Sequence, residues 1–154
     1  MPVEVGSQAP DFTLKNQNKE DVTLSSFRGE RNVLLVFYPF AFSSICTSEL
    51  CQVRDDLPHY QNDNVQILAV STDPTFALKA FADAEKYEFP LLSDFWPHGE
   101  VAKTYGVFNE ASGMANRGTF VIDKQGVVRF SELNEPGMPR DQEDWQRALE
   151  QLPA

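Results

Sequence analysis

Two short segments of the chain are almost continuously apolar. The first reads VLLVFY over Val33–Tyr38, and the second reads VQILAVS over Val65–Ser71. Runs of this length are typical of strands buried on both faces, as in the parallel centre of an α/β sheet. Pro39, which cannot continue a central strand, ends the first run. The pattern therefore predicts a sheet that is covered by other elements on both of its faces.

Amphipathic segments that alternate with these strands predict helices. They are Ser43–Tyr60, Pro74–Tyr87, the short Glu100–Tyr105 and the C-terminal Asp141–Leu152. In the first of them, apolar residues recur three or four positions apart and so share one stripe of a helix. These residues are Cys46, Leu50, Val53 and Leu57.

Shorter segments predict the edges of the sheet. Asp11–Phe27 holds two alternating stretches around a polar turn and predicts a hairpin, and Leu91–Ser93 predicts a short strand. Thr119–Asp123 and Val127–Glu132 flank the turn Lys124-Gln125-Gly126 and predict a second hairpin. The order ββ, β-α-β-α-β-α, ββ, α predicts a thioredoxin-like α/β sandwich with a central mixed sheet flanked by helices.

Composition and charge narrow the function classes. The 154 residues, 42% of them hydrophobic, suit one domain over residues 1–154 with its own core. Lys and Arg total 13 against 23 Asp and Glu, so the net charge of −10 disfavours nucleic acid and anionic membranes as partners. No apolar run reaches the roughly 20 residues of a membrane span. Because MPVEVGSQAPDF has no signal-sequence pattern, we expect a cytoplasmic protein.

Metal and cofactor chemistry find little support in the sequence. Two cysteines and two histidines are too few for a disulfide scaffold or a typical metal cage. His59 and His98 lack the short paired spacings of structural zinc sites, and no glycine-rich phosphate loop is present. We therefore expect neither a metal nor a cofactor, and the two thiols become the candidates for chemistry.

Cys46 lies where a strand gives way to a helix. Pro39 ends the strand and Ser43 or Ser44 can serve as the N-cap, so Cys46 falls in the first helical turn. The N–H groups of that turn have no internal partners, and the positive end of the helix dipole stabilises a thiolate there. A buried core cysteine on the apolar stripe is the competing interpretation, because most buried cysteines do no chemistry. Position and residue type alone leave both open.

The spacing of three residues adds a family resemblance. Pro39, Ser43 and Cys46 match the pattern Pro-x-x-x-(Thr/Ser)-x-x-Cys, and at this point the sequence resembles the peroxiredoxins. The resemblance covers nearly the whole chain and is nearest to the AhpE-type subgroup. The other segments that carry it are Gly6–Phe12, Val33–Tyr38, Leu91–Asp94, Ser93–His98, Tyr105–Asn109 and Asn116–Phe120.

The resemblance implies a role for each residue of the motif. Cys46 would be the peroxidatic cysteine, whose thiolate attacks one peroxide oxygen and becomes a sulfenic acid. The Ser43 hydroxyl can both donate to and accept from a peroxide. Threonine is commoner at this position, and serine loses the methyl group that would restrict its rotamer. Pro39 would wall the pocket without adding a competing N–H.

Two charged residues complete the site that the resemblance implies. Arg117 stands just before a predicted strand, where the family carries its active-site arginine, and its guanidinium would favour the thiolate and polarise the peroxide. A solvated surface arginine is the alternative. Glu49 matches a recurrent acidic position and could orient Arg117, or it could be a first-turn carboxylate that only complements the helix dipole.

Cys51 is the second thiol, five residues after Cys46 in the same predicted helix. Five helical steps turn about 140° from the starting direction and rise about 7.5 Å, so the sulfurs point to different faces. This separation exceeds the roughly 7 Å limit between the Cα atoms of a disulfide. Cys51 is expected on the polar side of the helix with Arg54 and Asp55. A Cys46–Cys51 bond would therefore require the first turns of this helix to unwind.

The same Cys-x-x-x-x-Cys spacing occurs in peroxiredoxins similar to the bacterioferritin-comigratory type, in which the second cysteine resolves the sulfenic acid. The AhpE-type pattern generally lacks a thiol at this position. The resemblance thus predicts Cys51 as a resolving cysteine that forms a disulfide with Cys46. The alternative is a free thiol at Cys51, with Cys46 reduced directly by an external thiol.

Two other function classes were weighed against a peroxidase of hydrogen peroxide, alkyl hydroperoxides or peroxynitrite. A thioredoxin-like disulfide oxidoreductase is disfavoured because the chain has no Cys-x-x-Cys pair. A non-catalytic redox sensor would have no use for Ser43 and Arg117. The reductant stays open between thioredoxin, a mycoredoxin or glutaredoxin-like protein and a low-molecular-weight thiol.

Aromatic residues near the predicted site bear on assembly. Phe40, Phe42, Phe95 and Trp96 are expected in the core by default. Phe40 and Phe42 flank the loop that precedes Cys46, however, and in the resembled family this region packs across a dimer interface. We therefore expect a homodimer or a higher homo-oligomer, supported by an exposed apolar patch at this loop.

Overall fold

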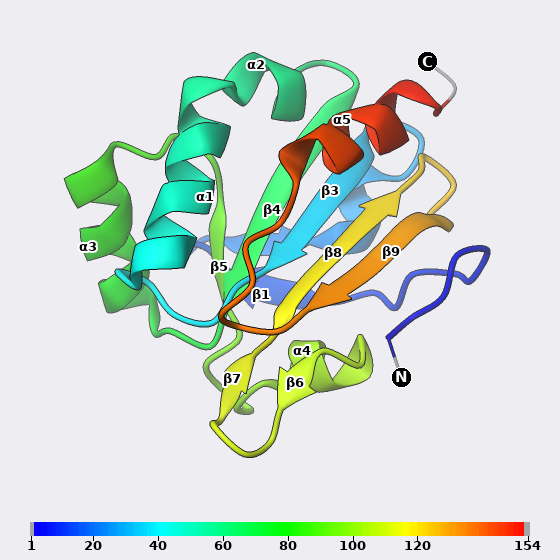
Figure 1. Cartoon of the computed structure of the whole chain (residues 1–154). Coiled ribbons are helices and arrows are strands. Elements are labelled where there is room, and N and C mark those ends of the chain that lie inside the picture. Colours follow the sequence, from blue (N-terminus) through cyan, green and yellow to red (C-terminus); the bar gives the residue numbers. More distant parts are fainter. Residues whose placement is uncertain (1, 153–154) are drawn as a thin grey trace.

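The structure is a computed structural model that describes residues 2–152. A seven-stranded sheet with the order β2-β1-β5-β4-β3-β8-β9 runs through the molecule (Figure 1). The strands β3, β4 and β5 are parallel to one another, whereas β8 and β9 on one side and β1 and β2 on the other pair antiparallel. The sheet strands are β1 (Thr13–Lys15), β2 (Asp21–Thr23), β3 (Asn32–Phe37), β4 (Val65–Ser71), β5 (Leu91–Ser93), β8 (Arg117–Ile122) and β9 (Val128–Asn134).

Helices cover both faces of this sheet. The helices are α1 (Ser44–Asp55), α2 (Leu57–Tyr60), α3 (Thr75–Glu85), α4 (Glu100–Thr104) and α5 (Gln142–Glu150), and a 3-10 helix spans Leu24–Phe27. One buried cluster joins Leu34 and Val36 of β3 to side chains of α1, α3 and α5. A second cluster joins Leu35 and Phe37, on the opposite face of β3, to α4 and the 3-10 helix. The predicted α/β sandwich with a mixed central sheet is confirmed.

The central strands agree closely with the apolar runs. Every residue of β3 and of β4 is buried, as expected for strands covered on both faces. The late hairpin is also present around Lys124-Gln125-Gly126, although β8 begins at Arg117 instead of Thr119. Arg117 is therefore the first residue of β8, a strand in which every residue is buried. Its side chain is buried for the same reason.

One local prediction is wrong, and one small element was not predicted. The expected helix over 43–60 is interrupted at Asp56, because Pro58 lacks an N–H and its ring clashes with the preceding turn. A small two-stranded sheet of β6 (Phe108–Asn109) and β7 (Met114–Ala115) was not predicted, because strands of two residues leave no periodic signal. In the described residues 2–152, none of the helices has the length and hydropathy to cross a membrane.

The four aromatic residues near the predicted site are not in the core. Phe40 and Phe42 are 40% and 55% exposed, and Phe95 and Trp96 are 49% and 81% exposed. All four lie in loops that follow the carboxyl ends of the parallel strands β3 and β5. The default expectation of burial is therefore wrong for all four, although the ring of Phe42 lies 4.9 Å from that of Phe81 in α3.

Candidate active site

The loop from β3 to α1 is held by the end of the neighbouring strand. The backbone N–H of Ala41 donates to Asp73 Oδ2 at 2.8 Å, just beyond β4. Phe42 has a φ of 68°, so the chain turns sharply there before the helix begins. Ser43 is the N-cap residue in an extended conformation, but its hydroxyl donates to the carbonyl of Phe40 at 3.0 Å instead of accepting from α1. The helix start predicted at Ser43 or Ser44 is thus confirmed.

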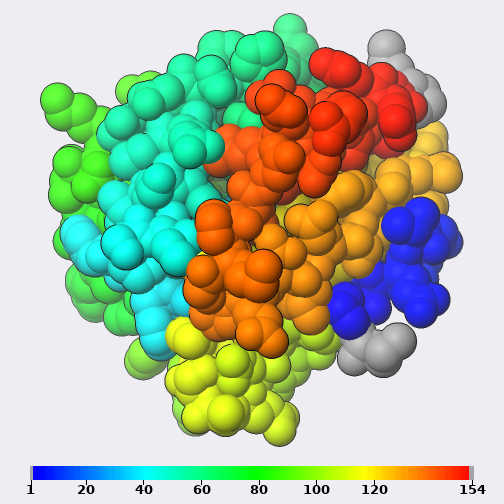
Figure 2. Space-filling view, viewed as in Figure 1, coloured from blue at the N-terminus to red at the C-terminus, as the bar shows by residue number. Residues whose placement is uncertain are grey.

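An open pocket of about 440 Å³ lies at this helix start. It brings together Pro39, Ser43 and Arg117, which are up to 78 positions apart in the sequence (117 − 39 = 78). Figure 2 shows the segments that form it meeting on one face: the start of α1 in cyan, the region of β7 in yellow and the loop after β9 in orange. The remaining lining residues are mainly apolar: Phe40, Ser44, Ile45, Met114, Pro136 and Gly137.

Cys46 is the third residue of α1 and is fully buried. It follows directly after Ser43, Ser44 and Ile45, three consecutive residues that line the pocket. Its side chain packs in the apolar cluster between α1 and the sheet, and the thiol is free. Its placement in the first helical turn is confirmed, and its sulfur is shielded from bulk water.

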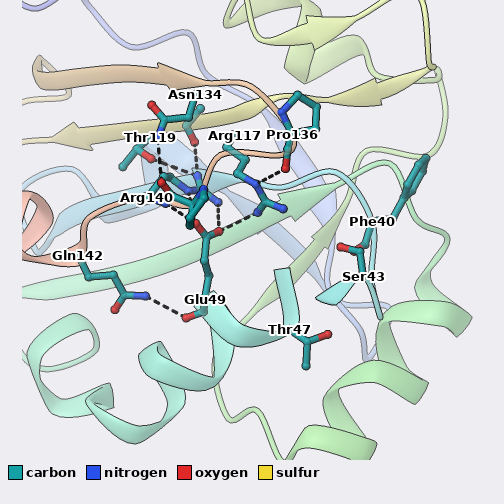
Figure 3. A network of polar contacts seen from close by, with 12 residues as sticks. Phe40, Ser43, Thr47, Glu49, Arg117, Thr119, Asn134, Pro136, Arg140 and Gln142 are labelled. Atoms are coloured by element: carbon teal, nitrogen blue, oxygen red, sulfur yellow. Dashed lines mark hydrogen bonds and ion pairs between the residues drawn. The ribbon is translucent and has the colours of Figure 1, made fainter. Parts of the chain in front are cut away.

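Arg117 extends from β8 toward α1 and is 2% exposed. Its Nη1 donates to Glu49 Oε1 at 2.8 Å, and its Nε donates to the carbonyl of Pro136 at 2.8 Å (Figure 3). Within residues 2–152 its Nη2 has no hydrogen-bond partner. In Figure 3 one guanidinium nitrogen points to the side on which Ser43 and Phe40 lie. The alternative of a solvated surface arginine is therefore wrong.

A second buried arginine, Arg140, completes this network. Its Nη2 donates to Glu49 Oε1 at 2.8 Å, and its backbone N–H and Nε donate to Glu49 Oε2 at 2.8 and 3.3 Å. Its Nη1 donates to the carbonyl of Gly118 and to Thr119 Oγ1, and its guanidinium lies 5.5 Å from the ring of Trp145. No sequence pattern predicted a role for Arg140. The one available signal was a cation just before a helix, where the dipole disfavours positive charge.

Glu49 is the anion between the two guanidinium groups. Burial alone would raise its pKa, but the hydrogen bonds and charge of Arg140, together with the charge of Arg117, outweigh burial and hold the pKa below its ordinary value. The cluster of one carboxylate and two guanidinium groups therefore keeps one excess positive charge. Because α1 starts at Ser44, Glu49 lies in the second turn, and its expected place as a first-turn carboxylate is wrong.

Cys51 does not lie on a solvated side of α1. Its side chain is half-buried against the end of α3, where the thiol donates to Glu85 Oε2 at 3.4 Å and lies 3.5 Å from the hydroxyl oxygen of Tyr87. These partners confirm the expected polar side of the helix for Cys51. Its partial burial against α3 was not predicted, because helical periodicity does not report which faces a neighbouring helix covers. Both cysteines are free thiols in this structure.

The histidines are remote from these thiols. His98 Nε2 lies 2.7 Å from the carbonyl of Gly113, beside the β6–β7 sheet, and His59 belongs to α2. Over residues 2–152, no group of three or more His, Cys, Asp or Glu side chains could hold a metal ion.

A thioredoxin-like sandwich with a cysteine in the first turn of a helix and a buried arginine beside its pocket defines a class of thiol-dependent redox enzymes. The model of the AhpC/TSA family matches residues 5–131, which is most of the chain. The chain therefore belongs to the AhpC/TSA family of peroxiredoxins and is a thiol peroxidase.

Individual relatives agree with this assignment. The chain is 54% identical over 152 residues to alkyl hydroperoxide reductase E of Mycobacterium tuberculosis strain H37Rv, and 99% of each chain is covered. It is 34% identical to the chloroplastic 2-Cys peroxiredoxin BAS1 of Hordeum vulgare, covering 96% of this chain and 74% of that protein.

Solved structures show the same fold. Peroxidoxin BcpB of Mycobacterium tuberculosis superimposes with a TM-score of 0.84 at 28% identity, covering 98% of this chain and 99% of that one. AhpC of Enterococcus faecalis superimposes with a TM-score of 0.85 at 32% identity, covering 95% and 90% of the two chains.

The first prediction concerns Glu49. Replacing it by glutamine (Glu49→Gln) leaves two buried guanidinium groups without an anion. We expect the free energy of unfolding at pH 7 to fall by about 3 kcal/mol, as for other buried ion pairs that lose one partner. Because the folded-state pKa of Glu49 lies below its ordinary 4.5, its stabilisation is present above that pH and is lost as the pH falls through the folded value.

Urea unfolding of wild type and Glu49→Gln between pH 7 and acid pH measures this difference. It should be largest at neutral pH and shrink on acidification. Glu88→Gln, at an exposed position, is the control and should have little effect at any pH. A difference that stays constant into acid would contradict the charged state assigned to Glu49.

Proposed function

We propose that residues 1–154 act as a single domain that reduces hydrogen peroxide and alkyl hydroperoxides through Cys46, with peroxynitrite as a further candidate substrate. The observation that carries this proposal is the pocket in which Pro39, Ser43 and Arg117 meet at the helix start that holds Cys46. The thiolate attacks one peroxide oxygen and the O–O bond breaks. Sulfur is oxidised to a sulfenic acid, and the departing oxygen takes a proton to leave as water or an alcohol.

Ser43 and Arg117 would act on the oxygens of the peroxide. Charge builds on the departing oxygen, so donors must be aimed at it before the reaction. Arg117 retains an Nη2 without a partner within residues 2–152 and lines the pocket, which leaves N–H groups for substrate. The Ser43 hydroxyl donates to the carbonyl of Phe40 at 3.0 Å, which leaves its oxygen as an acceptor for the O–H of a peroxide.

Glu49 and Arg140 would be positioning residues that act through Arg117. Glu49 Oε1 accepts from both guanidinium groups at 2.8 Å, so the orientation of Arg117 depends on a carboxylate that Arg140 holds in place. The bond from Arg117 Nε to the Pro136 carbonyl fixes the other side of its guanidinium. Rigid placement of this kind is what transition-state stabilisation by a fixed donor needs.

The pocket walls favour substrates with an apolar group. The apolar residues Pro39, Phe40, Ile45, Met114 and Pro136 all line the pocket, whose volume is about 440 Å³. Alkyl hydroperoxide reductase E, at 54% identity, carries this substrate class in its name. Pro39 is buried at the base of the loop and would keep water from the sulfur.

Cys51 would resolve the sulfenic acid. Its thiol attacks the sulfur of Cys46, a disulfide forms between them, and the sulfenic oxygen leaves as water. The supporting features are the five-residue spacing and a thiol that is half-buried beside α3. A Cys46 that is reduced directly by an external thiol stays the alternative, and a disulfide oxidoreductase or a redox sensor lacking peroxidase chemistry is disfavoured.

Three further features belong to the proposal. A thioredoxin, a mycoredoxin or glutaredoxin-like protein, or a low-molecular-weight thiol would return the enzyme to its reduced form. The exposed Phe40 and Phe42 support a homodimer or higher homo-oligomer through the loop before α1. We also propose a cytoplasmic location, in which thiols are kept reduced.

The second prediction is that Cys46→Ser stops peroxide consumption. A serine hydroxyl is not ionised near neutral pH, so no nucleophile remains at the helix start. Stopped-flow mixing of the reduced protein with hydrogen peroxide or an alkyl hydroperoxide measures the second-order rate constant, with Cys51→Ser as the matched control. If Cys46→Ser consumed peroxide as fast as wild type, the proposed peroxidatic role would be overturned.

The third prediction separates the two modes of resolution. After one equivalent of peroxide, intact-mass analysis of wild type should show the loss of two hydrogens and of both alkylatable thiols. Cys51→Ser should keep its first oxidation step but lose turnover with thioredoxin as reductant. A stable sulfenic acid on wild-type Cys46, with Cys51 still alkylatable, would instead establish the one-cysteine alternative.

The fourth prediction tests the apolar patch at Phe42. Asparagine adopts a positive φ more readily than other substitutes, so Phe42→Asn removes the exposed ring without straining the turn at 68°. We expect the dissociation constant of the dimer to rise about tenfold, in line with the burial of the exposed half of the ring on each of the two protomers. Sedimentation velocity over a concentration series measures it, with Val5→Ser as the control. A wild type that is monomeric throughout the series would count against the proposed oligomer.

A further inference from the structure

Tyr87 lies just after α3 and is fixed in a stack of aromatic rings. Its side chain is 5% exposed, and its ring centroid lies 5.1 Å from those of both Phe81 and Phe89. Its backbone N–H donates to the carbonyl of Ala82 at 3.0 Å, which ties the residue to the last turn of the helix. The ring therefore has little freedom, and the position of its hydroxyl is set by the core.

The Tyr87 hydroxyl contacts Thr47 and Cys51, which lie at the two ends of the stretch of α1 between the cysteines. It donates to the carbonyl of Thr47 at 3.2 Å and lies 3.5 Å from Cys51 Sγ. In an α-helix the carbonyl of residue 47 also accepts from the N–H of residue 51. Burial raises the pKa of the Tyr87 hydroxyl, so the group stays protonated and remains a donor.

The end of α3 holds the same part of α1 by two other contacts. The Cys51 thiol donates to Glu85 Oε2 at 3.4 Å, which requires the proton to be on sulfur because a carboxylate only accepts. Arg54 Nη1 donates to the carbonyl of Glu85 at 2.8 Å. Cys51 is thus part of a set of hydrogen bonds between α1 and the end of α3.

We propose that Tyr87 is a positioning residue that holds residues 46–51 in helical form and thereby limits the rate at which Cys51 reaches the sulfenic acid on Cys46. The inference rests on the proposed function, since it concerns the resolving step. The two sulfurs lie on different faces of the intact helix, about 140° apart, so the bond needs this turn to open. Opening it breaks the contacts of the Tyr87 hydroxyl with Thr47 and Cys51.

The strength of the Tyr87 contacts determines which of two reactions the sulfenic acid undergoes. When the turn opens, Cys51 Sγ attacks Cys46 Sγ, a disulfide forms and one water leaves. While the turn stays closed, a second peroxide can oxidise the sulfenic acid to a sulfinic acid, transferring one more oxygen to sulfur. A tighter hold therefore makes the enzyme more easily inactivated by excess peroxide.

The test is Tyr87→Phe, which removes the hydroxyl and keeps the ring stack. Tyr105→Phe is the matched control, because the Tyr105 hydroxyl donates to the carbonyl of Pro10 at 2.6 Å and its ring packs in the buried cluster on the other face of the sheet, away from α1. Loss of one net hydrogen bond should raise the open fraction of residues 46–51 about fivefold. Disulfide formation, followed by quenched-flow and intact mass, should accelerate by the same factor, and the sulfinic acid formed at high peroxide should fall.

Three readouts separate the outcomes. The rate of the first oxidation of Cys46 should match that of wild type in both variants, because neither hydroxyl lies at the pocket. Amide hydrogen exchange of residues 47–51 in the reduced protein should speed up about fivefold in Tyr87→Phe but not in Tyr105→Phe. An unchanged disulfide rate and unchanged sulfinic acid yield in Tyr87→Phe, with a disulfide that does form in wild type, would overturn the inference.

Failure of the proposed function gives a different pattern. If wild type and both variants form no Cys46–Cys51 disulfide, Cys51 does not resolve Cys46, and the proposed resolving role falls. Hydrogen exchange then decides the remaining part of the inference. Faster exchange in Tyr87→Phe alone supports the hold on the helix, whereas equal exchange in all three proteins overturns it.

Discussion

The buried carboxylate of Glu49 is the constraint on which the site depends. It joins α1 to the first residue of β8 and to the segment before α5, which are 68 and 91 positions away (Figure 3). Without this anion, two guanidinium groups would face each other in the core, where an uncompensated charge is very costly. Because Glu49 stands three residues after Cys46 on nearly the same helix face, the ion pairs that orient Arg117 also fix the rotation of α1 and hence the direction of the thiol.

Local charge therefore outweighs the charge of the whole chain. The net charge of −10 would disfavour a thiolate if it acted uniformly. Around α1, however, two arginines outnumber one carboxylate, and the free N–H groups of the first turn add partial positive charge. Salt and solvent screen the distant surface carboxylates much more than the buried cluster. An acidic protein can thus contain a pocket that favours an anion.

Local patterns predicted the fold and part of the site, and contacts across the sequence explain what was missed. Pro39, Ser43 and Cys46 lie within eight positions, so their spacing is readable in the chain. The pairing of Glu49 with Arg140 depends on how α5 packs, and no periodicity in either segment encodes it. The neighbours of Cys51 were missed for the same reason, since Glu85 and Tyr87 follow it by 34 and 36 residues.

The proposed function places two opposed demands on helix α1, and its contacts indicate how both could be met. Attack by Cys46 needs a closed first turn, whereas a bond to Cys51 needs that turn to open. On one side Glu49 is paired with two arginines, and separating the carboxylate from them would cost about 3–5 kcal/mol. On the other side the Tyr87 hydroxyl holds Thr47 and Cys51, and Glu85 accepts from Cys51 and Arg54. The loss of one such hydrogen bond costs about 1 kcal/mol. If Cys51 resolves Cys46 as proposed, the backbone can therefore open along the α3 side while the Glu49 side chain stays paired, and the arginine site would survive each proposed cycle.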